Sequence, residues 1–270
     1  MRVAHCSDLH LDFLQSKEEV LTLANNLCTD AAVLCIAGDT LESKELEFAM
    51  NPNSGKHGQA QRYVQFFEIL AAHYQAVLVI MGNHEHYNGN ITDTYDIFYD
   101  FFRVFNLRNC YILENEFITV NDVRFYCGTG WTDMGSVHSD WYTKQVMNDF
   151  RLIRKAGYGK FTPNDARILH AEFLRLPWQV ETADVILMHH APSIQSIQDR
   201  YKDDPLSIAY YSKTFEEKLK AAKLPLPLTI IHGHTHYPVN YKLTDKITVV
   251  SNPRGYDYAP ELFKIEVIDV

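Results

Sequence analysis

The sequence lacks the features that mark membrane-inserted or secreted proteins. No apolar run approaches the roughly 20 residues of a membrane-spanning helix, and the opening residues MRVAHCSD hold no apolar signal core. The five cysteines form no CxxC pair and are odd in number, which argues against a disulfide framework. We therefore expect reduced cysteines in a cytoplasmic protein that does not enter a membrane.

Basic residues are also in short supply. The 25 lysines and arginines stand against 34 acidic residues, which gives a net charge of −9. Non-specific nucleic-acid binding depends on basic surface, so the charge disfavours nucleic acid as a partner, although a local basic groove would still permit it. Hydrophobic residues make up 46% of the chain, enough for a sizeable core. We expect a single domain over residues 1–270.

Short apolar runs alternate with longer helical segments along the chain. We expect strands at 2–6, 31–37, 76–81, 184–188 and 228–232, and helices at 16–28, 58–74, 92–106 and 162–176. Strands at 110–113, 116–120 and 123–128 are predicted to form an antiparallel meander. The closing runs ITVVS and LFKIEVI are predicted to form a β-pair or part of one. This order indicates an α/β fold with several parallel connections.

The segment 131–161 fits this pattern least. It contains glycines, aromatic residues such as Trp131 and a few basic residues, without clear periodicity. A long irregular segment in a compact domain is often a lid or a substrate loop, and an ordinary surface excursion is the alternative. In a loop of this kind Trp131 could stack on a nucleic-acid base or serve only in packing.

Side chains of types that commonly bind metals follow five of the expected strands. The side chains in question are Asp8 and His10, Asp39, Asn83 to Glu85, His189 and His190, and the three histidines of HGHTH, residues 232–236. In open α/β sheets, sites form beyond the carboxyl ends of the strands. These residues, far apart in the sequence, are therefore predicted to converge.

The mixture of donor types indicates which ions would bind. Imidazole with carboxylate suits Mn, Fe, Zn, Co or Ni better than Ca or Mg, and no cysteine follows any of these strands. The donors exceed what one ion needs, which suggests two metals about 3.5–4 Å apart that share a carboxylate. Such a positive centre would attract a phosphate ester and stabilise the charge of its transition state.

Five short motifs in this order resemble the calcineurin-like metallophosphoesterase superfamily. They are DLH at 8–10, GD at 38–39, GNHE at 82–85, HHAP at 189–192 and GHTH at 233–236. The resemblance implies a four-layer α/β/β/α sandwich of two mixed β-sheets flanked by helices. It also implies two divalent metal ions, Mn²⁺ foremost, with Fe, Zn, Co or Ni as alternatives.

The resemblance assigns a role to each matching residue. One metal would be held by Asp8, His10, His236 and a bridging Asp39, and the other by Asp39, Asn83, His189 and His234. His84 matches a histidine that contacts the phosphate or protonates the leaving group. NPRGY at 252–256 resembles a segment of small bacterial and phage members, in which Arg254 could contact substrate; an ordinary turn arginine is the alternative.

The implied reaction is hydrolysis of a phosphoester, in which a metal-bridging hydroxide attacks phosphorus in line. The expected substrate is a small nucleotide-type molecule or a phosphodiester, and the enzyme a phosphodiesterase or phosphatase. A nuclease acting on nucleic-acid ends and a non-catalytic scaffold are the alternatives. Residues 38–44 read GDTLESK where protein Ser/Thr phosphatases carry GDxxDRG, which disfavours that activity. The partner that orients His84 stays open; Glu85 is a candidate by adjacency, and a structural hydrogen-bonding role is the alternative for it.

Overall fold

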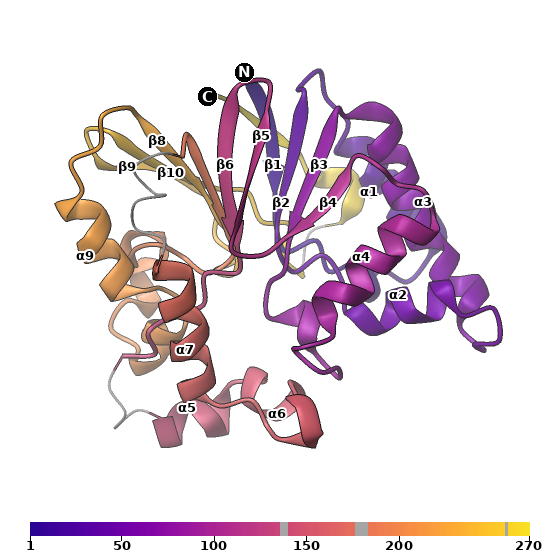
Figure 1. Cartoon of the computed structure of the whole chain (residues 1–270), viewed down its shortest axis with the longest axis horizontal. Coiled ribbons are helices and arrows are strands. Elements are labelled where there is room, and N and C mark those ends of the chain that lie inside the picture. Colours follow the sequence, from indigo (N-terminus) through magenta and orange to yellow (C-terminus); the bar gives the residue numbers. More distant parts are fainter. Residues whose placement is uncertain (136–139, 176–182, 257–258) are drawn as a thin grey trace.

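Two β-sheets pack against each other, and helices cover their outer faces (Figure 1). The computed structural model describes the whole chain except residues 136–139, 176–182 and 257–258. The first sheet has the strand order β11-β1-β2-β3-β4. Its strands are β1 (Arg2–Cys6), β2 (Val33–Ala37), β3 (Ala76–Ile80), β4 (Cys110–Leu113) and β11 (Glu266–Asp269). All its neighbouring pairs are parallel except β11 with β1.

The second sheet has the order β5-β6-β7-β8-β10-β9. Its four central strands run parallel, and its two edge strands are antiparallel to their neighbours. The strands are β5 (Glu116–Val120), β6 (Val123–Gly128), β7 (Val185–Met188), β8 (Leu228–Ile231), β9 (Val239–Thr244) and β10 (Ile247–Ser251). Both sheets are therefore mixed, as the resemblance implied.

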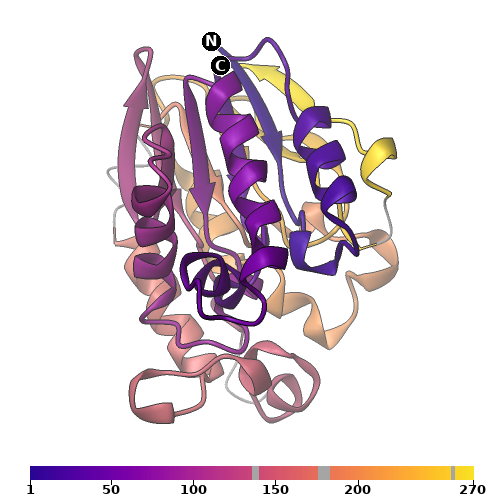
Figure 2. The same ribbon diagram turned by 90° about the vertical axis from the view of Figure 1, so that its right-hand side faces the viewer.

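The helices form the two outer layers. Over the first sheet lie α1 (Lys17–Asn26), α2 (Ser43–Met50), α3 (His57–His73) and α4 (Thr94–Val104), on the side that faces the viewer in Figure 2. Phe173 of α7 (Pro163–Leu174) and Phe215 of α9 (Lys213–Ala221) pack with residues of the second sheet. The predicted four-layer sandwich is confirmed.

The side-chain alternation of β2 explains how the layers hold together. All five of its residues are buried, as expected for a parallel strand covered on both faces. Leu34 and Ile36 pack with the residues beneath the helices. Val33 and Cys35 pack between the sheets, in a cluster that includes Phe125 of β6. Successive residues of β2 point to opposite faces. This one strand therefore packs against the helices on one face and against the second sheet on the other.

Two predicted helix starts are confirmed by their capping boxes. Ser16 accepts a hydrogen bond from the backbone N–H of Glu19, and the Glu19 carboxylate accepts one from Ser16 N. Thr162 and Asp165 form the same reciprocal pair at the start of α7. Each box satisfies backbone donors that the first turn of a helix leaves free.

The predicted antiparallel meander is confirmed for its last two strands and wrong for its first. Strand β4 pairs in parallel with β3 in the first sheet, whereas β5 and β6 form a hairpin in the second. The chain changes sheets between β4 and β5, where Asn115 adopts a left-handed φ of 54°. The runs ITVVS and LFKIEVI do not pair with each other, because β10 and β11 belong to different sheets. Each is instead part of another antiparallel pair, β10 with β9 and β11 with β1. Strand periodicity reports which face is buried and leaves open which sheet a strand joins.

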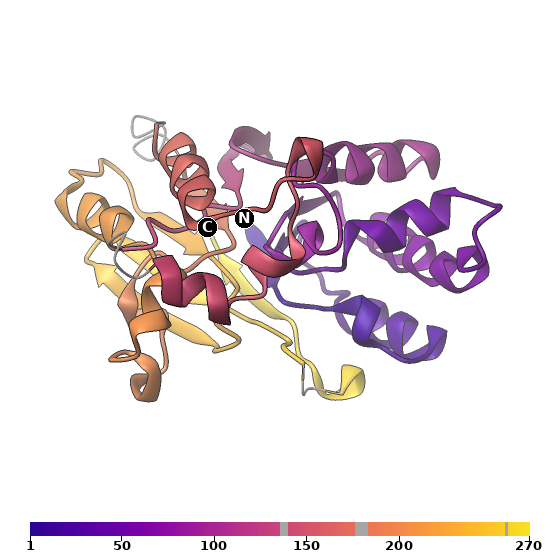
Figure 3. The ribbon, with the colours of Figure 1, turned by 90° about the horizontal axis from the view of Figure 1, so that it is seen from below.

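The described parts of the segment 131–161, residues 131–135 and 140–161, lie at the carboxyl ends of the parallel strands, the lower end of the molecule in Figure 1. They contain α5 (Asp140–Val146), α6 (Asp149–Leu152) and a short turn of helix at Ala156–Tyr158. Figure 3 looks at this end and shows these elements lying over it. All five cysteines are free thiols. No described helix is long and apolar enough to cross a membrane.

Candidate metal centre

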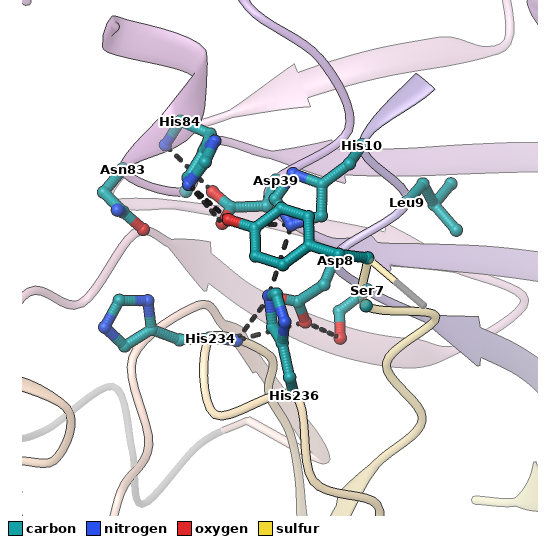
Figure 4. A network of polar contacts seen from close by, with 12 residues as sticks. Ser7, Asp8, Leu9, His10, Asp39, Asn83, His84, His234 and His236 are labelled. Atoms are coloured by element: carbon teal, nitrogen blue, oxygen red, sulfur yellow. Dashed lines mark hydrogen bonds and ion pairs between the residues drawn. The ribbon is translucent and has the colours of Figure 1, made fainter. Parts of the chain in front are cut away.

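The seven predicted ligands lie together where the two sheets meet, and Figure 4 labels all of them except His189. The first sheet supplies the residues that follow β1, β2 and β3, and the second supplies those that follow β7 and β8. Potential donor atoms within 4.8 Å of one another form two sets: Asp8, His10, Asp39 and His236, and Asp39, His189 and His234. Only Asp39 belongs to both.

Distances in the first set are short enough for one ion to reach every member. His236 Nε2 lies 3.2 Å from His10 Nε2 and 3.2 Å from Asp8 Oδ1. His10 Nε2 lies 3.9 Å from Asp39 Oδ2. Two imidazole nitrogens and two carboxylates therefore face one another with their donor atoms inward.

The second set includes the predicted amide ligand. His189 Nε2 lies 3.4 Å from Asp39 Oδ1 and 3.0 Å from Asn83 Oδ1. His234 Nε2 is buried and has no hydrogen-bond partner among the described residues. The two oxygens of Asp39 thus face different sets, Oδ2 toward His10 and Oδ1 toward His189.

The backbone at the strand ends is held in an uncommon conformation. The left-handed φ region is rare for residues other than glycine and costs on the order of 1–3 kcal/mol each. Five of the seven predicted ligands adopt it: Asp8, His10, Asp39, His234 and His236. Hydrogen bonds between the loops hold these turns, among them His10 N to Asp39 O and His234 N to Asp8 Oδ1, both 3.0 Å.

Gly82 permits the close approach of two of these loops. A Cβ atom at this position would overlap Asp39 Oδ1 and lie 2.7 Å from the Asp39 backbone nitrogen. Only a residue without a side chain fits there. The glycine of GNHE is therefore required for Asp39 to reach both ligand sets.

Glu85 fixes the same loops and does not orient His84 as adjacency suggested. Its buried carboxylate accepts backbone hydrogen bonds from Asp39 (3.0 Å), Thr40 (2.6 Å) and Gly82 (2.7 Å). His84 is held by other groups: its Nε2 lies 3.0 Å from the Tyr256 hydroxyl, and its ring centroid lies 4.2 Å from that of Tyr87. Of the two roles considered for Glu85, the structure supports the structural hydrogen-bonding role, because its carboxylate is bonded to the backbone.

The remaining histidines of the motifs separate into ligand and supporting positions. His189 Nδ1 donates to Ala37 O at 2.8 Å, which turns Nε2 toward the ligand set. His190 lies outside both sets, 3.5 Å from Thr129 O through Nδ1. His232 is buried, with Nε2 2.8 Å from Ser196 Oγ and Nδ1 bonded to Gly233 O. It therefore stabilises the turn and belongs to neither ligand set.

The charges of the site fit bound cations. Burial and the carboxylates of Glu85 and Asp8 raise the pKa of Asp39 well above its usual value, because each neighbouring negative charge opposes its ionisation. Burial lowers the pKa of His10 and His234, which keeps the rings neutral and their lone pairs free for a metal. A cluster of buried carboxylates, neutral imidazoles and an unpaired ring nitrogen is chemically suited to divalent transition metals.

A family model for calcineurin-like phosphoesterases matches residues 1–238. The chain belongs to this family. The motif-based resemblance is thus confirmed, and the protein is a metal-dependent phosphoester hydrolase. An uncharacterized protein of Acanthamoeba polyphaga mimivirus is 25% identical over 284 residues, which cover 94% of this chain and 91% of that protein.

Solved structures share the fold of this phosphoesterase at low sequence identity. The phosphopantetheinyl hydrolase from Mycobacterium tuberculosis superposes with a TM-score of 0.67 at 14% identity, over 98% of this chain and 95% of that one. A dimetal phosphatase from Danio rerio gives a TM-score of 0.56 at 13% identity, over 99% and 91%. At these identities, both similarities show a shared fold and nothing more.

Asp149 is a site residue of this phosphoesterase that the sequence did not reveal. Its buried Oδ1 accepts hydrogen bonds from Asn83 Nδ2 at 2.8 Å and from the Tyr87 hydroxyl at 2.7 Å. The amide nitrogen is held from one side, so Asn83 Oδ1 faces His189 on the other. Asp149 belongs to the segment 131–161. No other feature of the sequence indicated it than the expectation that this segment is a lid or a substrate loop.

Arg254 and Trp131 do not occupy the positions expected of substrate contacts. The Arg254 side chain is buried, and its Nη1 donates to Leu9 O at 2.7 Å. Trp131 is 2% exposed, with its ring centroid 4.8 Å from that of Phe161 and 5.0 Å from that of His190. Neither lines the cavity over the ligand sets. Their positions favour the alternatives given for them above, packing for Trp131 and a structural turn residue for Arg254.

Proposed function

We propose that the two ligand sets hold two divalent metal ions bridged by Asp39, and that the protein hydrolyses a small phosphodiester or phosphomonoester there. The observation that supports this most is the position of Asp39. Its two oxygens face His10 Nε2 at 3.9 Å and His189 Nε2 at 3.4 Å, on opposite sides of one carboxylate. A carboxylate shared in this way is typical of centres with two metals.

Manganese is the ion we expect, with Fe, Zn, Co and Ni as alternatives, because the donors combine imidazole, carboxylate and amide oxygen. When bound, two such ions supply Lewis acidity and a nucleophile that forms near neutral pH. The chain itself orients the donors. Glu85 holds the loop of Asp39, Asp149 holds Asn83, and Ala37 O holds the ring of His189.

His84 is the residue we expect to act on the substrate. Its Nε2 lies 4.0 Å from Asp39 Oδ2, and its side chain is 12% exposed toward the cavity. Burial, and then the charge of His189, lower the pKa of His84 to about 3. A bound phosphoester would favour the protonated ring, because an opposite charge nearby raises a histidine pKa. His84 would then hold a phosphoryl oxygen or give its proton to the leaving oxygen.

A substrate panel with added Mn²⁺ tests the proposal. It should compare aryl phosphate monoesters and diesters, cyclic nucleotides and DNA, with metal analysis of the same protein. We expect about two bound metals per chain and metal-dependent hydrolysis of a small ester. Asp39→Asn should lose that activity. Asp100 is exposed on α4 and belongs to neither ligand set. Asp100→Asn removes the same charge there and serves as the control.

Two results would contradict the proposal. Full activity of the Asp39→Asn protein would exclude a bridging role for this carboxylate. Absence of both bound metal and turnover in the unaltered protein would favour a non-catalytic scaffold on the same fold.

A further inference from the structure

The cavity over the candidate metal centre has a floor and walls of different chemistry. Its volume is about 530 Å³, within the range of small-molecule sites. The floor consists of ligand-set residues and His84. The walls come from Tyr87, from residues 146–149 between the end of α5 and the start of α6, from the segment 197–210 after β7, and from Tyr256 near the C-terminus. The walls therefore contact whatever part of a substrate extends beyond its phosphoryl group.

Apolar and aromatic side chains form most of these walls. Four tyrosines and four aliphatic residues line them: Tyr87, Tyr201, Tyr210, Tyr256, Val146, Met147, Ile197 and Leu206. Some rings also cover the imidazoles of the floor, with centroids 4.4 Å apart for Tyr256 and His10 and 4.8 Å apart for Tyr210 and His234. Burial of an apolar or aromatic group against such a surface is favourable.

Positive charge is missing from the same walls. The described lining includes no lysine or arginine, and residues 136–139, 176–182 and 257–258 contain none in their sequence. Basic residues of the neighbouring segments have other partners: Lys155 lies 2.9 Å from Asp165, and Lys202 lies 2.7 Å from Asp199. Arg200 does not line the cavity, and its Nε donates to Gln198 Oε1 at 2.9 Å. Arg151, which is exposed, bonds the side chain of Asn148 and does not line the cavity.

Negative charge is present in the walls. Asp149 is buried beside Asn83, and its Oδ2 has no hydrogen-bond partner among the described residues. Asp204 is exposed, and its Oδ1 accepts a hydrogen bond from Leu206 N at 2.8 Å. A substrate that carried a second anionic group beyond its phosphoryl group would approach these carboxylates with no lysine or arginine among the described lining residues to offset the repulsion. Nucleic acids and nucleoside polyphosphates carry such groups.

We propose that this cavity selects phosphoesters of small molecules whose ester group is uncharged and partly aromatic or aliphatic, and discriminates against esters that carry further negative charge. This inference rests on the proposed function, since it assumes that the phosphoryl group sits on the floor. The sequence left open whether the substrate is a small phosphoester or the end of a nucleic acid. The inference favours the small phosphoester, because a nuclease would need cations along the walls.

Binding of two matched phosphonates to the Mn²⁺-loaded protein tests the selection without requiring turnover. Phenylphosphonate and 4-carboxyphenylphosphonate differ by one carboxylate at the far end of the ring. We expect phenylphosphonate to bind at least tenfold more tightly in calorimetric titrations. Equal affinity, or tighter binding of the carboxylated compound, would overturn the inference.

A change of wall charge shows whether electrostatics causes the preference. Val146 lines the cavity and is 44% exposed, so a longer side chain fits without disturbing the core. Val146→Lys should reduce the tenfold preference to threefold or less, whereas the uncharged control Val146→Gln should keep it. The same ratio in both variants would contradict a charge-based selection.

Hydrolysis of phenyl phosphate and 4-carboxyphenyl phosphate, and of their methyl diesters, separates this inference from the proposed function. We expect the uncharged esters to have the higher kcat/KM, mainly through a lower KM. Selective binding without hydrolysis of any ester would contradict the proposed function and leave the selection intact. Hydrolysis of both members of each pair with equal KM would contradict the selection and leave the function intact.

Discussion

The floor and the walls of the cavity are built in different ways. Floor residues follow the ends of buried parallel strands, where hydrogen bonds between loops hold five of the seven ligands in left-handed turns. The walls come from short helices and irregular segments, such as residues 146–149 and 197–210. The floor is polar and held by both sheets, whereas the walls are largely apolar and partly exposed.

This difference indicates that the floor and the walls control different properties of the reaction. A donor atom displaced by 1 Å weakens the positioning of the reacting groups for any substrate. A wall residue acts only on substrates that reach it. Changes in the floor should therefore reduce the hydrolysis of every ester, whereas changes in the walls should alter the preference among esters. The predictions below test this division, from the largest expected effect to the smallest.

Removal of the metals should have the largest effect. Chelation with EDTA should abolish hydrolysis of every ester, and Mn²⁺ should restore it. Mn²⁺ should also stabilise the fold, by about 2.7 kcal/mol at 100 times its Kd, because it offsets the buried carboxylates Asp8 and Asp39. Thermal unfolding with and without Mn²⁺ measures this. Undiminished activity after exhaustive chelation would show that the floor works without metal.

Replacement of the bridging carboxylate should come next. Changes to groups that only support metal ligands cost roughly 10–100-fold, so Asp39→Asn should lower kcat/KM by more than about 100-fold for every ester. Measurements on the whole substrate panel check this. A loss confined to one ester would break the division between floor and walls.

Asp149 joins the two regions, and its replacement should have an intermediate effect. Asp149→Ala frees the amide of Asn83 and should weaken Mn²⁺ binding and kcat/KM by roughly 10–100-fold. Asp149→Asn keeps an acceptor oxygen for Asn83 Nδ2 and the Tyr87 hydroxyl and should stay close to the unaltered protein. Equal losses in both variants would assign the effect to charge instead of to the position of Asn83.

The floor could be predicted from the sequence because each ligand directly follows a buried strand. Apolar runs such as AVLCIA and AVLVIM identify the strands, and parallel strands bring their ends to one edge. The distances among Asp39, His10 and His189 follow from this arrangement. The layers were predictable for the same reason, whereas the sheet to which β4 or β11 belongs was not.

The walls could not be predicted because their contacts have no periodic signal. Asp149 reaches Asn83 across 66 residues and Tyr256 reaches His84 across 172, and no pattern in either segment indicates the partner. Arg254 shows the converse, because a motif suggested a substrate contact and its guanidinium instead bonds the backbone of Leu9 outside the cavity lining. Such contacts depend on the path of loops through space.

Tyr256 tests a contact between wall and floor. Tyr256→Phe removes the hydroxyl at His84 Nε2 and keeps the ring over His10. One hydrogen bond contributes about 0.5–1.5 kcal/mol, so kcat should fall by about 2–10-fold, with little change in Mn²⁺ affinity. Tyr99→Phe, at an exposed tyrosine of α4, is the matched control. A change in metal affinity without a change in kcat would place Tyr256 with the ligands instead.

The smallest effect is expected at Asp204, on the exposed part of the walls. Asp204→Asn removes one negative charge but keeps an oxygen that can accept from Leu206 N. Salt and water screen an exposed charge, so affinity for 4-carboxyphenylphosphonate should rise by no more than about threefold, while that for phenylphosphonate stays constant. Asp203→Asn changes the neighbouring charge, which does not line the cavity, and should leave both affinities unchanged. The gain should shrink as salt is added, because it is electrostatic. An equal gain for both phosphonates would mean that Asp204 acts on the shape of the cavity, and wall charge would then no longer explain the preference at this position.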